Sequence, residues 1–155
     1  MSQHNIQSYA KEALKEKITE AAVSVKVLNA ERTFWEKATI LHQYAHLPDG
    51  KPLPPRISRH FYDFFRLLNS EIKAKALKDL TLLERVATHK SIYFASGWAN
   101  YGTARKGTLK LSPLERVMKD LEKDYALMEA MFFRKRPEWM EILKAVRAFE
   151  KEFNA

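Results

Sequence analysis

Apolar residues recur three or four positions apart through much of this chain, the spacing that places side chains on one face of an α-helix. The clearest stripes run over about 30–46 and about 59–76, with Phe34, Ala38, Leu41 and Ala45 in the first and Phe61, Phe64, Phe65, Leu68 and Ile72 in the second. Further helices are expected over about 80–95, 113–133 and 137–153. The pattern predicts a mainly α fold, a helical bundle of about five to six helices.

Start signals support the first helices of this bundle. Asn29 and Ser58 are placed to act as N-caps of the first two. Thr81 and Glu84 have the spacing of a capping box for the next helix, although Asp79 could cap it instead.

Two loops separate the helices. Residues 47–57 hold four prolines and a Pro-Asp-Gly turn, which predicts a stiff connection. Residues 96–112 hold three of the four glycines, and a loop of this length inside a compact domain is often functional. Residues 112–115, Ser-Pro-Leu-Glu, then restart a helix with a cap, a proline at its first position and a glutamate at its third.

The first 28 residues follow a different pattern. Residues 8–20 read as a short amphipathic helix, and Val23, Val25 and Val27 then alternate with polar residues as in a β-strand. A single strand leaves its backbone groups unpaired, so this one needs a partner that the sequence does not reveal. We therefore divide the chain into residues 1–28, a short helix plus a strand, and residues 29–155, the helical bundle.

The charge balance narrows the range of partners. Lys and Arg total 27 against 19 Asp and Glu, a formal net charge of +8. This excess favours acidic partners, nucleic acid first, although many basic proteins bind nothing acidic. There is no apolar run of the roughly 18 residues needed to span a membrane, and no cysteine for a disulfide framework. We expect a cytoplasmic protein with no membrane partner.

Charged residues on the first two helices are candidate site residues. Lys37 flanks the apolar stripe, where it either packs its stem and leaves its amine in water or holds an anion such as a nucleotide phosphate. Arg59, Asp63 and Arg66 are neighbours on the next helix. They form either an exposed ion cluster or a carboxylate site for a metal, a base or a positioning role. Position alone favours the structural reading of both.

Histidine and aromatic residues raise two further possibilities. His42 and His46 are four residues apart, as zinc ligands can be, but no third ligand is evident and we predict no metal site. The long loop interleaves aromatic with basic residues, namely Trp98, Tyr101, Arg105, Lys106 and Lys110. This mixture suits stacking on bases and binding phosphates, or else the aromatic rings fix the loop to the core.

Three segments together give the chain a family resemblance. They are residues 31–42 (ERTFWEKATILH), 58–63 (SRHFYD) and 86–90 (VATHK). In this order they resemble the nucleotidyltransferase toxins of the AbiEii/AbiGii abortive-infection family. The likeness runs from about Val25 almost to the C-terminus, so it implies the C-terminal helical region of such a toxin.

The resemblance implies a fold and an activity. Members have a nucleotidyltransferase domain, a mixed sheet with helices, followed by a helical bundle. They are toxins of type IV toxin–antitoxin and phage-defence systems, and a cognate antitoxin counteracts them. They transfer a nucleotide from an NTP, with Mg²⁺, onto RNA such as tRNA.

The resemblance also implies roles for individual residues. Lys37 matches the family's helix lysine and would contact the nucleotide phosphates, and Asp63, in an Arg-x-x-x-Asp element with Arg59, would complete or support the site. His60 stands where many members have an acidic residue. The predicted catalytic residues are therefore Lys37 and Asp63, and the predicted nucleotide- or RNA-binding residues are Lys37, Arg59, Arg105, Lys106 and Lys110.

The family's Gly-Ser motif and Asp-x-Asp arrangement are absent from this sequence. Phosphoryl transfer needs carboxylates that hold metal ions, so we expect the chain to bind no cofactor alone. We interpret residues 1–28 as a remnant or edge of the nucleotidyltransferase domain and expect a toxin part that is inactive without a separate such domain. The alternatives are a non-catalytic module that binds RNA or antitoxin through its basic residues, including 134–136, and a degenerate remnant.

Overall fold

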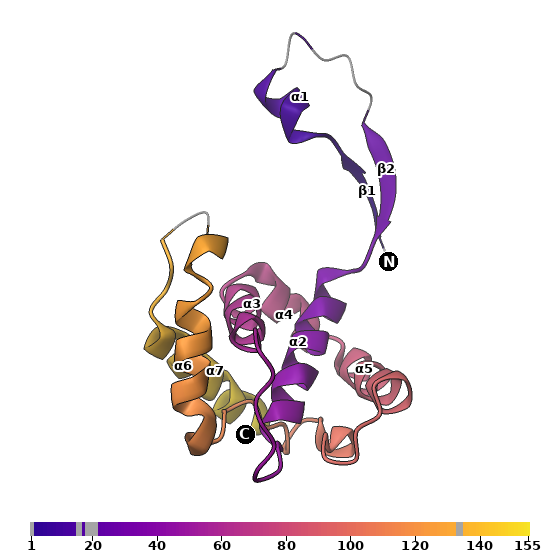
Figure 1. The fold of residues 1–155 in the computed structure, drawn as a ribbon. Helices are drawn as coiled ribbons and strands as arrows, with labels where there is room; N and C mark the ends of the chain where they lie inside the picture. The colour runs from indigo at the N-terminus through magenta and orange to yellow at the C-terminus, as the bar shows by residue number, and fades with distance from the viewer. Residues whose placement is uncertain (1, 15–16, 18–21, 133–134) are drawn as a thin grey trace. The chain divides into compact units, whose positions relative to one another are not determined.

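A computed structural model of the chain describes residues 2–14, 17, 22–132 and 135–155 (Figure 1). The chain divides into two compact units, residues 1–30 and 31–155, and each is described by itself. Helices dominate, and the β structure of the described residues is one short segment near the N-terminus. The expectation of a mainly α fold with a short N-terminal β segment is confirmed.

The first unit contains a two-stranded antiparallel sheet. Strand β1 (Ser2–Ile6) pairs with β2 (Val23–Val27), with Ser2 opposite Val27 and Ile6 opposite Val23. The partner of the valine-rich strand is thus the polar N-terminal segment, where no strand was expected. Helix α1 (Tyr9–Ala13) lies between the strands in sequence and is shorter than the predicted 8–20, of which residues 15, 16 and 18–20 lie outside the described residues.

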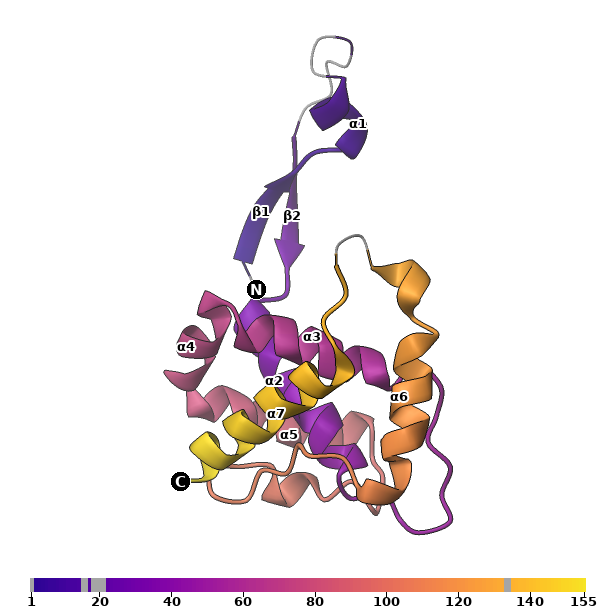
Figure 2. The same ribbon diagram turned by 90° about the vertical axis from the view of Figure 1, so that its left-hand side faces the viewer.

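The second unit is built from helices and short 3-10 turns. Its α-helices are α2 (Ala30–Tyr44, whose first residue belongs to the first unit), α3 (Ser58–Leu68), α4 (Glu71–Leu77), α5 (Leu80–Tyr93), α6 (Met118–Ala126) and α7 (Trp139–Asn154). Helix α3 contacts α4, α6 and α7, and Figure 2 shows α7 meeting α3 at an angle. Of the helices in the described residues, none is long and apolar enough to cross a membrane.

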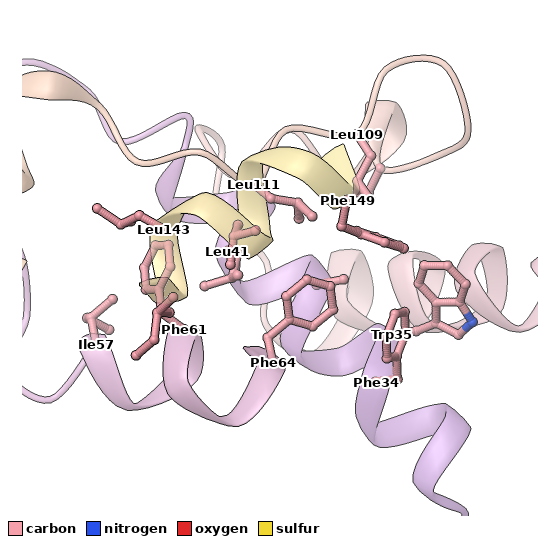
Figure 3. Packing of buried hydrophobic residues seen from close by; sticks show 14 of the residues in the cluster. Phe34, Trp35, Leu41, Ile57, Phe61, Phe64, Leu109, Leu111, Leu143 and Phe149 are labelled. Atoms are coloured by element: carbon pink, nitrogen blue, oxygen red, sulfur yellow. The ribbon is translucent and has the colours of Figure 1, made fainter. Parts of the chain in front are cut away.

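An aromatic cluster from three helices forms the centre of the core (Figure 3). The ring of Phe34 on α2 lies 4.9 Å from that of Phe64 on α3 and 5.6 Å from that of Phe149 on α7, measured between centroids. Phe64 and Phe149 are 5.5 Å apart, and all three side chains are at most 2% exposed. These contacts fix α2 against α3 and so determine which residues of the two helices face each other at the surface.

Two predicted helices differ from the structure in length. The helix expected over 59–76 is broken between α3 and α4, because the Asn69 side chain donates to the Phe65 carbonyl and the Ser70 hydroxyl accepts from the Ile72 N–H. The helix expected over 113–133 is reduced to α6 with a 3-10 turn on either side, at Glu115–Val117 and Glu129–Met131.

The N-terminus of α3 is capped by a residue from another helix. Ser58 was expected to be the cap, but it is the first helical residue. The carboxylate of Asp124 on α6 instead accepts from the backbone N–H groups of Arg56 (2.6 Å) and Ser58 (2.8 Å). A negative charge at this position also complements the helix dipole. For α5 the Asp79 alternative is confirmed, since its carboxylate accepts from the Leu82 N–H.

Candidate functional site

The two residues predicted to be catalytic meet at the surface between α2 and α3. The Lys37 amine donates to Oδ2 of Asp63 at 2.7 Å and lies 3.3 Å from Nδ1 of His60. The Lys37 side chain is 21% exposed and that of Asp63 is 40% exposed, so the amine reaches the surface while the stem is largely covered. We call Lys37, His60 and Asp63 the lysine site.

Burial and nearby positive charge keep His60 of this site neutral. Burial lowers the pKa of His60 to about 4, and Lys37, Arg59 and Lys90 lower it as well, against an opposing effect of Asp63. A neutral His60 can accept a hydrogen bond from the Lys37 ammonium group at Nδ1, and its own proton is then on Nε2. The imidazole therefore acts as a second acceptor for the Lys37 ammonium group.

Lys90 is a further cation that the sequence reasoning did not single out. Burial lowers its pKa, Glu36 raises it and Lys37 lowers it, so its amine lies within electrostatic reach of both side chains. His60 and Lys90 both fall inside the segments that carry the family resemblance, but spacing alone did not distinguish them from surface residues.

Arg59 lies on the same face of α3 as Asp63, four residues earlier, and is exposed. Within the described parts of the chain it forms no ion pair. Its guanidinium group is therefore available to an anion that reaches the lysine site.

The long loop over 96–112 carries the other predicted binding residues at separate places. Arg105 lines a hollow with Thr88 and Tyr101, whereas Lys106 lines another with Leu80 and Phe153. Neither hollow includes Lys37, Arg59 or Asp63, and Lys110 is exposed elsewhere on the loop. The structure thus does not place these three basic residues at the lysine site.

The aromatic residues of the loop fix it to the core. The Tyr101 side chain is 7% exposed and its hydroxyl donates to Oε1 of Gln43 at 3.0 Å. Trp98 packs against Tyr44, with ring centroids 5.8 Å apart, and the amine of Lys51 lies 4.8 Å from the Trp98 ring. The anchoring interpretation accounts for both rings.

His42 has a structural role in the same region. Its Nδ1 accepts from the backbone N–H of Lys110 at 3.0 Å, and its Nε2 lies 3.0 Å from the Asn100 carbonyl. Because Nδ1 accepts, the neutral ring carries its proton on Nε2 and donates to that carbonyl. Both ring nitrogens are engaged with the loop backbone, and His46 hydrogen-bonds through Nδ1 to the His42 carbonyl at 2.8 Å.

The residues at the lysine site do not fit a magnesium ion. Among the described residues there is no group of three or more His, Asp or Glu side chains that could hold a metal. Asp63 alone contributes a carboxylate to the lysine site, and one of its oxygens already accepts from Lys37. We therefore derive no step through a metal ion at this site.

A family model described as the nucleotidyl transferase AbiEii toxin of a type IV toxin–antitoxin system matches residues 1–151. The chain belongs to this AbiEii family. The match extends the resemblance from about Val25 to the N-terminus and so includes β1 and α1 of this AbiEii chain. No curated protein and no solved structure matches it. Membership in a type IV toxin family implies a cognate antitoxin as partner.

Proposed function

We propose that this AbiEii chain supplies the lysine-bearing side of a nucleotide-binding site and that Lys37 contacts the phosphates of an NTP. The observation that carries the proposal is the 2.7 Å contact between Lys37 and Asp63, two residues 26 apart in the chain that both match family motifs. Arg59, exposed on the same face of α3 as Asp63, would add a second cation for the phosphates.

Asp63 and His60 would act by positioning the lysine. A free lysine side chain loses rotamer entropy when it binds a phosphate, but an amine that is already held by two acceptors loses less. The positive charge of Lys37 then offsets the negative charge that spreads over the phosphoryl oxygens during transfer. Asp63 is in this view a positioning residue for Lys37.

We further propose that the chain does not transfer nucleotides alone. In-line transfer needs carboxylates that hold metal ions against the developing charge, and the sequence contains no Asp-x-Asp arrangement. A nucleotidyltransferase domain on another polypeptide segment would supply these carboxylates, the magnesium and the remaining contacts to the NTP. The acceptor would be an RNA such as tRNA, and the setting the cytoplasm during phage defence.

Nucleotide affinity tests the role of Lys37. Loss of a hydrogen bond from a charged donor costs about 1.5–3 kcal/mol, so Lys37→Ala should weaken the binding of each NTP about 10- to 150-fold. Lys119→Ala, which removes an exposed lysine of α6, is the matched control and should change the Kd less than twofold. Isothermal titration calorimetry measures both. Equal affinity of the two variants would overturn the assignment of Lys37.

A transfer assay tests the incompleteness of the chain. The purified chain, incubated with each α-labelled NTP, Mg²⁺ and bulk tRNA, should leave the RNA unlabelled. A polypeptide that carries the Gly-Ser and Asp-x-Asp motifs should restore labelling when it is added. Labelling of RNA by the chain alone would show that the active site is complete without it.

A further inference from the structure

A second cluster of cations lies on α3 and the segment that leads into α7. A hollow of about 370 Å³ is lined by Phe65 and Arg66 of α3, by residues 135–138 and by Glu141. Arg66 and Lys135 are exposed, and Arg136 is half-buried. None of these three cations forms an ion pair with a described residue.

Arg136 is fixed in place but has an unused donor. Its guanidinium carbon lies 5.2 Å from the centroid of the Tyr125 ring, and the Tyr125 hydroxyl donates to the Pro137 carbonyl at 2.9 Å. Tyr125 thus holds both the guanidinium plane and the backbone beside it. Nη1 of Arg136 is buried with no hydrogen-bond partner in the described structure. Arg136 therefore has hydrogen-bonding capacity that the described residues leave unused.

The hollow is adjacent to the lysine site along α3. Arg59, Asp63 and Arg66 are spaced by four and three residues and therefore share one face of that helix. Three residues of an α-helix advance about 4.5 Å, so the backbone of Arg66 is less than one turn beyond that of Asp63. A chain of phosphates that passes the lysine site along α3 would reach the hollow next.

We propose that Arg66, Lys135 and Arg136 bind backbone phosphates of a single-stranded RNA segment in this hollow. Guanidinium groups donate in pairs to phosphate oxygens, and the half-buried ring of Phe65 in the same hollow offers a surface on which a base can stack. The choice of RNA rests on the proposed function, since the acceptor strand must end at the lysine site. The cation cluster itself does not depend on it.

Two carboxylates in the lining set the strength of this site. Glu138 and Glu141 line the same hollow and are exposed. They repel a phosphate and so lower the affinity that the three cations would otherwise give. Neutralising these carboxylates should therefore raise the affinity for RNA, whereas neutralising the cations should lower it.

Fluorescence anisotropy tests the proposal. A labelled 20-nucleotide single-stranded RNA is titrated with the full chain at several salt concentrations and without NTP. The double variant R66Q/K135Q should bind about tenfold more weakly. The slope of log Kd against log salt should fall by about 1.4, since each neutralised phosphate of a single strand contributes about 0.7. R136Q should weaken binding in the same direction. The variant E138Q/E141Q should bind about threefold more tightly.

The matched control is K119Q/K144Q, which removes the same net charge from exposed positions on α6 and α7. It should change the Kd less than twofold, and thermal melting of each variant separates loss of binding from loss of fold. Equal weakening in R66Q/K135Q and K119Q/K144Q would overturn the proposal, as would tighter binding of polyglutamate than of RNA. Because no NTP is present, failure here leaves the nucleotide role of Lys37 intact, and failure of the Lys37 test leaves this result intact.

Discussion

The Lys37 amine is held between a carboxylate and a neutral imidazole, which differ in what they do to its charge. Asp63 offsets the lysine charge, whereas His60 accepts a hydrogen bond and adds no negative charge. The charges of Lys37 and Asp63 cancel. The excess positive charge near the lysine site at neutral pH therefore comes from Arg59 and Lys90, which both lower the pKa of His60. An anion that reaches the lysine site therefore meets uncompensated positive charge.

Protonation of His60 should destabilise the folded chain in acid. Its pKa is about 4 in the folded state against an ordinary value of 6.5, so between these values the unfolded chain binds more protons. Stability is therefore unaffected by His60 above about pH 6.5 and should fall as the pH drops from there toward 4. His60→Gln, which keeps a neutral acceptor at every pH, should reduce this drop in melting temperature. His89→Gln should not reduce the decrease in melting temperature. The same decrease in both variants would contradict the assignment to His60.

At the scale of elements, side chains of two helices hold the glycine-rich loop. The Glu150 carboxylate on α7 accepts from the N–H groups of Leu111 and Ser112, both at 2.6 Å. One turn later Asn154 bonds to both the N–H and the carbonyl of Leu109, at 3.1 and 2.7 Å. With His42 bound from α2, the loop is tied to two helices and its length does not imply a free segment.

Removal of the Glu150 carboxylate should loosen this loop. Glu150→Ala leaves two backbone donors without their acceptor and should lower the free energy of unfolding by about 2–3 kcal/mol. Amide hydrogen exchange at Leu111 and Ser112 should accelerate as well. The matched control is Glu152→Ala, which removes a carboxylate of the same helix that pairs with Lys73 at the surface and should cost less than about 1 kcal/mol. Equal losses in chemical denaturation would contradict the anchoring role.

The apolar spacing of the sequence predicted α2, α5 and α7 well because that signal is local. The cap prediction failed where the deciding contact is distant in the chain, since Asp124 of α6 and not Ser58 accepts from the backbone at the start of α3. The apolar spacing also missed β1, a polar strand without alternation. The meeting of Lys37 with Asp63 followed from the family resemblance, since position alone favoured a structural role for each.

At the scale of the second unit, the aromatic cluster and the lysine site both form where α2 packs against α3. Phe34 lies three residues before Lys37 on α2, and Phe64 immediately follows Asp63 on α3. The contact between the two rings in the interior thus sets the distance between the two charged groups at the surface.

Truncation of the central ring should therefore reduce the stability of the fold. Phe64→Ala leaves a cavity in a fully buried position and should lower the free energy of unfolding by about 3–5 kcal/mol. Ile92→Ala, at a position that is 64% exposed, should change it by less than about 0.5 kcal/mol. Urea denaturation of the two variants makes the comparison, and similar midpoints would show that the cluster is not the centre of the core.

Because Asp124 caps the N-terminus of α3, the stability of that first turn depends on the position of α6. A molecule that binds α6 and moves Asp124 would remove the cap of α3, the helix that carries Asp63 and Arg66. If a nucleotide binds at the lysine site as proposed, a molecule that changes its affinity through α6 has its own affinity changed by the nucleotide by the same factor. A ligand of α6 would thus act on the lysine site without occupying it.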